Sequence, residues 1–164
     1  MISFDVVGNP APKGSSRAMI RGGRAVHVPS GSEVNRQRLA SWKTAVVDSA
    51  RHYAGSLLTG PVGVSIVFRF PMRVADVKRG HPRPNAPRYH TSKPDVDKLL
   101  RSTLDAITSS GVWTDDSQVS ISLAAKAYVP PGAWIGAQVF IGSVTDSGFA
   151  DRFIGAIADS ERPS

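Results

Sequence analysis

A proline-rich, basic stretch at residues 71–94 constrains this chain more than any other feature of its sequence. Five of these residues are proline. Because proline lacks a backbone N–H and fixes φ, the stretch can form neither a helix nor a central strand. We therefore expect a long, mobile, basic loop that separates two groups of regular elements.

The segments on either side of this loop have the periodicity of mixed helices and strands. Strands are predicted at 2–7, 62–70, 117–128 and 134–144, and a hairpin with a glycine turn at 19–28. One helix is predicted from a capping box at 30–33 to about Tyr53, and a second helix over 95–110, ended by Gly111. We expect a single α+β domain with a small mixed sheet of four or five strands packed by two main helices.

The charge of the chain is strongly basic. It has 20 lysine and arginine residues against 13 acidic ones, a net charge of +7. A basic balance of this kind points first to nucleic acid as the partner, although charge on a loop can also serve solubility alone. The candidate DNA-binding residues are Lys13, Arg17, Arg73, Lys78, Arg79, Arg83, Arg88, Lys93 and Lys98.

Several classes of protein are excluded by what the sequence lacks. There is no cysteine, so disulfides, thiolate zinc sites and cysteine nucleophiles are ruled out. The four histidines show no metal-ligand spacing, so a metal site would use oxygen ligands, which favour Mg²⁺ or Mn²⁺. No run approaches the roughly 20 apolar residues that span a bilayer, and the N-terminus does not resemble a signal peptide. We expect a cytoplasmic protein that does not bind membranes.

Two pairs of aspartates flank the second predicted helix. Asp95 and Asp97 lie at its start, where Pro94 allows them to converge on one point. Asp115 and Asp116 lie just beyond its end. A helix of this length is about 24 Å long, so the two pairs meet only if the chain doubles back after Gly111. We predict that it does, and that the gathered carboxylates hold a divalent metal.

Such a site is suited to phosphodiester hydrolysis. A bound metal would polarise the phosphate and lower the pKa of its water. Arg101, one turn beyond Asp97, is the candidate cation for charge that develops on the phosphate oxygens. Each residue also has a purely structural interpretation: Asp95 as an N-cap, Asp97 as a partner of the helix dipole, the second pair as a turn, and Arg101 in a surface ion pair with Asp97 or Asp105.

The pattern around these aspartates resembles a known family. Its positions are Asp95, Asp97, Leu99, a basic residue at 101, Asp105, Ala106, Gly111, Trp113, Asp115, Asp116, Gln118 and Val119. They resemble the RusA-type Holliday junction resolvases, endonucleases that are common in bacteria and their phages. The resemblance is strong over 93–119 and looser over 2–70. On this basis the nuclease domain spans 1–144, and 145–164 is a tail or a short helix without a counterpart.

The resemblance implies a mixed α/β fold, a homodimer, magnesium dependence and cleavage of four-way DNA junctions in recombination and repair. It assigns metal-binding catalytic roles to Asp95, Asp97 and Asp116. We assign supporting roles to Asp105 and Asp115, which also fit the pattern.

Two positions depart from the family pattern. The family's essential lysine falls at Arg101, and arginine cannot act as a general acid at neutral pH. The family usually has asparagine where this chain has Lys98, which cannot accept a hydrogen bond. Two alternatives therefore stand beside the resolvase: a catalytically weak or inactive junction-binding protein of the same fold, and a metal nuclease that acts on flaps or forks.

Overall fold

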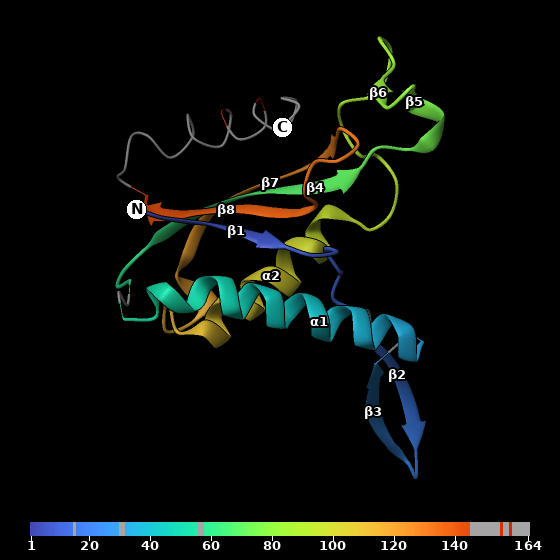
Figure 1. Ribbon diagram of the computed structural model, residues 1–164. Coiled ribbons are helices and arrows are strands. Elements are labelled where there is room, and N and C mark those ends of the chain that lie inside the picture. The colour runs from blue at the N-terminus through green and yellow to red at the C-terminus, as the bar shows by residue number, and fades with distance from the viewer. Residues whose placement is uncertain (15, 30–31, 56–57, 145–154, 156–157, 159–164) are drawn as a thin grey trace.

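A mixed four-stranded sheet forms the centre of the protein. The computed structural model describes residues 1–14, 16–29, 32–55, 58–144, 155 and 158 (Figure 1). The sheet contains β1 (Ile2–Val7), β4 (Val62–Pro71), β7 (Val119–Val129) and β8 (Gly136–Ser143), in the order β1-β8-β4-β7. β4 and β7 are parallel, and the other neighbours are antiparallel. The predicted α+β fold with a small mixed sheet and two helices is confirmed.

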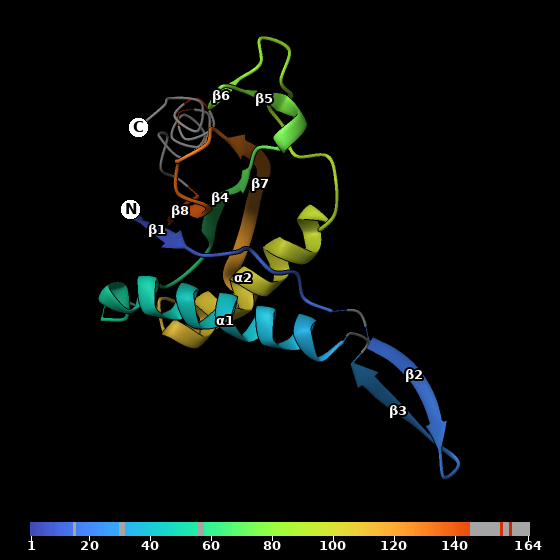
Figure 2. The ribbon, with the colours of Figure 1, turned by 45° about the vertical axis from the view of Figure 1, so that its right-hand side comes forward.

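The two helices, α1 (Glu33–Ala50) and α2 (Val96–Ser110), pack on the same side of the sheet (Figures 1 and 2). Between them and β4 lies the main core, in which Trp42 of α1 packs against Phe68 of β4. The indole Nε1 of Trp42 also donates to Thr103 Oγ1 of α2 at 3.1 Å, which satisfies its buried N–H. Each fully buried aromatic side chain of this kind contributes about 1.5–3 kcal/mol.

The ends of both helices agree with the sequence signals, with one correction. α2 ends at Gly111, whose φ of 80° suits glycine in the left-handed conformation. The N-cap of α1 is Ser32, whose side chain accepts from Asn35 N at 3.3 Å. The predicted cap, Ser30, lies outside the described residues. The α-helix stops at Ala50, and a 3₁₀ turn, η1 (Arg51–Tyr53), completes the predicted length.

The buried face of α2 is rotated from the predicted one. Of the predicted residues, Leu99, Thr103 and Ile107 are buried, whereas Leu100 and Leu104 are only partly buried. Ser102 and Ala106 are buried as well, because the chain after β1 lies against this part of the helix. Ser102 Oγ donates to Ala11 O at 2.7 Å. Sequence periodicity could not show this contact, since it joins segments 91 residues apart.

Two arms project from the body (Figures 1 and 2). The first is the hairpin of β2 (Ser16–Arg21) and β3 (Arg24–Pro29), which extends beyond the start of α1 and turns at two glycines with positive φ. The second arm is formed by the basic stretch. It contains a 3₁₀ turn, η2 (Val74–Asp76), and a two-residue hairpin of β5 (Val77–Lys78) and β6 (His81–Pro82).

The expectation that residues 71–94 are a loop throughout is therefore too simple. β4 extends to Pro71, and the end of the stretch runs beside β7. His90 N donates to Lys126 O and Tyr128 N donates to Arg88 O, both at 2.9 Å. The His90 ring also stacks on Phe70, with 4.2 Å between centroids. The prediction that this arm is mobile stays a prediction.

The expected helix within 145–164 falls outside the described residues, apart from positions 155 and 158. In the part of the chain that the structure describes, no helix has both the length and the apolar character that crossing a membrane requires.

Candidate functional site

The start of α2 presents two exposed carboxylates. Asp95 is the N-cap and Asp97 lies in the first turn, and both side chains are exposed. Asp95 accepts no capping hydrogen bond through its side chain. Its Oδ2 lies 3.3 Å from Lys98 Nζ in an exposed ion pair. The helix N-terminus favours negative charge here by about 0.3–1 kcal/mol. The position of Asp95 is that of a cap, but its carboxylate is not used for capping.

The chain that leads into Asp95 is held by a lysine from the sheet. Lys126 Nζ donates to Ser92 O at 2.6 Å and to Pro94 O at 2.7 Å. Lys126 is partly buried on β7, in register with Phe68 of β4. Sequence reasoning missed this residue. The available signal was a single charge in the otherwise apolar run 123–129, because a charge inside a sheet normally has a specific partner.

The second acidic pair lies beyond the other end of α2. Asp116 begins the 3₁₀ turn η3 (Asp116–Gln118) and is exposed. Asp115 caps this turn and accepts from Ser117 N at 2.8 Å. Hydrogen bonds from the side chain and backbone of Ser117 lower the pKa of Asp115 below its ordinary value. The structural interpretation therefore accounts for Asp115.

Gln118 fixes this turn to the body of the protein. Its Oε1 accepts from Thr114 N at 2.9 Å. Its Nε2 donates to Leu58 O at 3.0 Å and to Gly60 O at 3.1 Å. Gln118 Oε1 also accepts from Asp115 N at 3.4 Å, so the position of Asp116 depends on one amide side chain that joins four backbone groups. The sequence pattern contained Gln118, but nothing in it indicated this role.

Replacing Gln118 should weaken the fold. Gln118→Ala would leave Thr114 N–H, Leu58 O and Gly60 O without this partner, and we expect a loss of about 1–3 kcal/mol in the free energy of unfolding. Urea unfolding would show it as a lower midpoint with an unchanged slope. Ser120→Ala, which removes only a 3.5 Å hydrogen bond to Gln118 O, is the matched control. Equal midpoints for the two variants would refute this role.

The two acidic groups lie at opposite ends of α2. The 15 residues of the helix correspond to about 22 Å. The returning strand gives a similar length: Lys126 contacts Pro94 and lies seven residues from Val119, which at 3.3 Å per residue is about 23 Å. Asp116 precedes Val119, so it lies near the far end of the helix from Asp95.

The prediction that one chain gathers Asp95, Asp97 and Asp116 is therefore wrong. The chain does double back after Gly111, but Asp116 lies at the start of the returning segment, and the end of that segment brings Lys126 to Asp95. Among the described residues, no group of three or more His, Cys, Asp or Glu side chains could hold a metal ion. The individual roles of the three aspartates stay predictions.

Of the remaining charged residues of α2, Asp105 connects neighbouring segments, whereas Arg101 is exposed. Asp105 accepts Lys13 Nζ at 2.8 Å and lies 3.6 Å from Lys43 Nζ, so it ties the N-terminal segment and α1 to α2. Lys13, predicted to contact DNA, thus has a structural partner. Arg101 is exposed, and within the described residues it forms no ion pair with Asp97 or Asp105.

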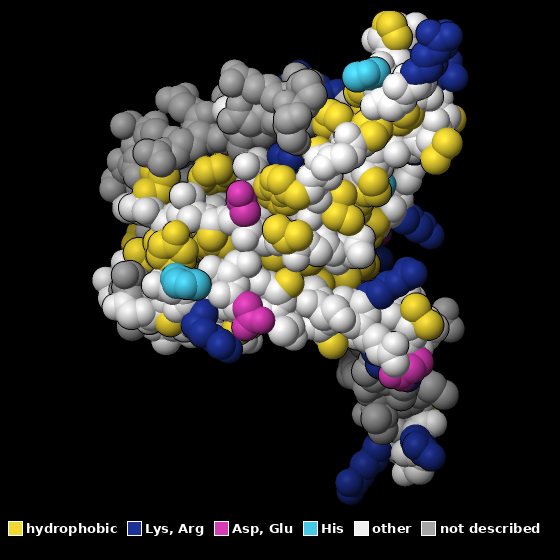
Figure 3. All heavy atoms as spheres, in the orientation of Figure 1, with side chains coloured by type: hydrophobic (Ala, Val, Ile, Leu, Met, Phe, Trp, Pro, Cys, Tyr) yellow, Lys and Arg dark blue, Asp and Glu magenta, His cyan; other side chains and the backbone are white. Residues whose placement is uncertain are grey.

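The predicted DNA-binding residues gather mainly on the second arm. Lys78, Arg79, Arg83, Arg88 and Lys93 are exposed there. Arg73 is exposed too, but it pairs with Asp76 at 2.6 Å. The side chain of Arg17, on the hairpin arm, is outside the description, whereas Arg21 and Arg24 are exposed at its tip. Figure 3 shows lysine and arginine side chains at both projecting arms, and Figure 2 shows the segment leading into α2 between them.

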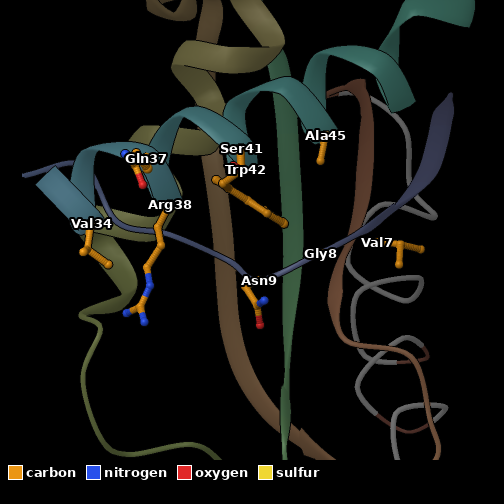
Figure 4. A pocket seen from close by; sticks show the side chains of 9 residues that line it. All are labelled: Val7, Gly8, Asn9, Val34, Gln37, Arg38, Ser41, Trp42 and Ala45. Carbon is orange, nitrogen blue, oxygen red and sulfur yellow. The ribbon is translucent and has the colours of Figure 1, made fainter.

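A separate hollow of about 530 Å³ lies between residues 34–45 of α1 and residues 7–9. Arg38 and Asn9 point to the same side of it (Figure 4), beside the exposed Val34. None of the predicted metal ligands lines this hollow. It is therefore not the acidic site.

Comparison with known proteins identifies the family of this chain. A sequence model of the family described as "RusA: Endodeoxyribonuclease RusA" matches residues 8–135. This range includes both arms, both helices and all four aspartates of the two pairs. The chain is also 31% identical over 132 residues to a Bacillus subtilis (strain 168) protein described as "Uncharacterized protein YqaN". That alignment covers 77% of this chain and 87% of the relative.

Proposed function

This chain belongs to the RusA endodeoxyribonuclease family, and from that premise we propose that it is a magnesium-dependent nuclease that cleaves four-way DNA junctions. One observation carries this proposal: two exposed carboxylates lie at a helix N-terminus between two basic arms. Carboxylates are unsuited to binding phosphate by themselves, so a cation between them and the DNA is the natural complement.

Asp95 and Asp97 fit a magnesium ion by their chemistry. Magnesium in nucleases and polymerases takes one or two carboxylates, several waters and the oxygens of the substrate phosphate, and manganese can replace it. When bound, the metal would polarise the phosphate and lower the pKa of the attacking water. Arg101 lies one turn after Asp97, where its guanidinium would stabilise charge on the phosphate oxygens.

The place of Asp116 follows from the homodimer that the family resemblance implies. Within one chain, Asp116 is about 22 Å of helix away from Asp95. In a two-fold dimer, the far end of α2 in one copy can lie beside the near end in the other. We therefore assign the third ligand to Asp116 of the partner subunit, which gives two equivalent sites per dimer.

The exposed edge of β7 is a suitable surface for this dimer. β7 is an edge strand, and its residues 120–122 are exposed, with Ile121 45% exposed. Antiparallel pairing of two such edges around Ile121 would bring the turn η3, which carries Asp116, toward the end of the partner's β7 that carries Lys126. Lys126 contacts Pro94, so Asp116 would come close to the partner's Asp95. Residues 88–90 already pair with this edge at Lys126–Tyr128, so it is the part around Ile121 that resembles the strand edges that readily pair with another chain.

The two arms would hold the DNA backbone. Exposed lysines and arginines give affinity with little sequence information and make binding depend on salt. Two projecting basic arms with the start of α2 between them suit a substrate recognised by its shape. A dimer with two sites then suits a junction with two equivalent strands.

A direct test compares four-way junctions, flaps, forks and linear duplexes in the presence and absence of Mg²⁺. We expect paired nicks in the junction, slower cleavage of the other substrates, and no cleavage after the metal is chelated. If flaps or forks are cleaved faster than junctions, the protein is still a nuclease, but its substrate is not the four-way junction.

One observation favours the second candidate, an inactive junction-binding protein. The Lys98 ammonium lies 3.3 Å from Asp95 Oδ2, where it competes with a metal. Tight junction binding without cleavage at any Mg²⁺ concentration would support that function. Recovery of cleavage in Lys98→Asn would assign the loss to this ion pair.

A further inference from the structure

We propose that Lys126 is a positioning residue of the nuclease site, one that fixes the main chain before Asp95 so that the two carboxylates of α2 meet the metal in a defined geometry. The inference rests on the proposed function and deepens it. Lys126 lies on β7, 31 residues beyond Asp95, and it belongs to none of the acidic or arm residues described above.

The contacts of Lys126 are directed at this segment. Its ammonium donates to Ser92 O and Pro94 O at 2.6 and 2.7 Å, so it binds the two carbonyls on either side of Lys93. The main-chain oxygen of Lys126 accepts from His90 N at 2.9 Å. Three hydrogen bonds to Lys126 thus hold the segment 90–94. Pro94, the last residue of this segment, directly precedes Asp95.

The support behind Lys126 is rigid. It lies in register with Phe68, which is fully buried, and the next residue, Ala127, is fully buried as well. By contrast, the carboxylates themselves are exposed and make few contacts: Asp95 has one exposed ion pair, and no ion pair of Asp97 occurs among the described residues. The geometry of the metal site must therefore come from the main chain that carries the carboxylates.

Lysine suits this work by its chemistry. An ammonium carries three donors and no acceptor, so it can serve two carbonyls at once. Groups that orient metal ligands in this way typically alter metal affinity or activity by about 10–100-fold when they are removed.

The test uses the full chain with Lys126→Met, Lys126→Arg and the matched control Lys43→Met. Lys43 is also partly exposed and also carries one charge, but it faces Asp105 on the side of α2 away from its start. Calorimetric titration with Mn²⁺ in the absence of DNA measures metal affinity. Amide resonances of residues 92–98 report the position of the segment, and circular dichroism reports the fold.

We expect Lys126→Met to bind Mn²⁺ about 10–100-fold more weakly than the wild type, with shifted resonances at 92–98, and Lys43→Met to change neither. Lys126→Arg keeps the charge and the donors, so it should recover most of the lost affinity. If Lys126→Met does not fold, Lys126→Gln, which lacks the charge and the reach, takes its place with the same expected loss.

The outcomes separate the two proposals. If the wild type binds Mn²⁺ and nicks junctions, and Lys126→Met does so equally well, the inference about Lys126 is wrong and the nuclease stands. A loss of stability with unchanged metal affinity would make Lys126 a purely structural anchor and would also overturn the inference. If the wild type itself neither binds Mn²⁺ nor cleaves, the proposed function fails and this inference fails with it.

Discussion

Asp97→Asn is expected to abolish the nicking of four-way junctions while the protein still binds them. The amide keeps the shape of the side chain but removes the charge that would hold the metal. A metal ion contributes several kcal/mol to the transition state, so we expect a rate lower by at least about 100-fold. Quantitative nicking under single-turnover conditions measures the loss.

The structure separates this effect from misfolding. Asp97 is exposed, and among the described residues no hydrogen bond or ion pair of its carboxylate is found. The free energy of unfolding should therefore fall by no more than about 0.3–1 kcal/mol, the contribution of one charge at the helix N-terminus. Binding to the junction in the absence of metal should be equal or tighter, because one negative charge near the phosphates is lost. Asp48→Asn, which alters an exposed aspartate on α1 that faces Arg51 at 3.5 Å, is the control. If Asp97→Asn cleaves junctions at the wild-type rate, Asp97 is not a metal ligand and the proposed metal site at the start of α2 is wrong.

Mixing two inactive variants is expected to restore cleavage. Asp97→Asn and Asp116→Asn should each be inactive alone, since every site of either homodimer lacks one ligand. In a mixed dimer with shared sites, one site carries both substitutions and the other carries neither. Random exchange of subunits makes about half of the dimers mixed, each with one of two sites intact, so about a quarter of the wild-type nicking rate should return.

The result distinguishes a shared site from a site within one chain. If Asp116 served the same chain as Asp97, no mixed dimer would contain an intact site, and the mixture would stay inactive. Subunit exchange must be verified separately, for instance by co-expression with two affinity tags. Ile121→Asp, which places a charge on the proposed β7 edge, should weaken the dimer and lower cleavage together. A monomer that cleaves normally would contradict the shared site.

The elements of this fold could be read from the sequence because their signals are local. The strands, the hairpin and both helices follow from the spacing of apolar residues and from end signals such as Gly111 after α2, although the serine that caps α1 is Ser32 and not the predicted Ser30. The predictions failed where the partner was remote. The rotated buried face of α2 depends on Ala11, and the order within the basic stretch depends on backbone bonds to β7.

The candidate site was likewise predicted in part from local sequence and decided in part by the tertiary structure. The chemical character of the carboxylates, their place at a helix start and the basic surroundings were determined by the sequence alone, since residue type and local spacing fix them. Only the tertiary structure decided that Asp116 stays at the far end of α2 and does not return to Asp95, that Gln118 holds it there, and that Lys126 contacts the chain before Asp95. These facts depend on the direction in which β7 returns beside β4, and strand direction is set by long-range pairing that no local pattern encodes.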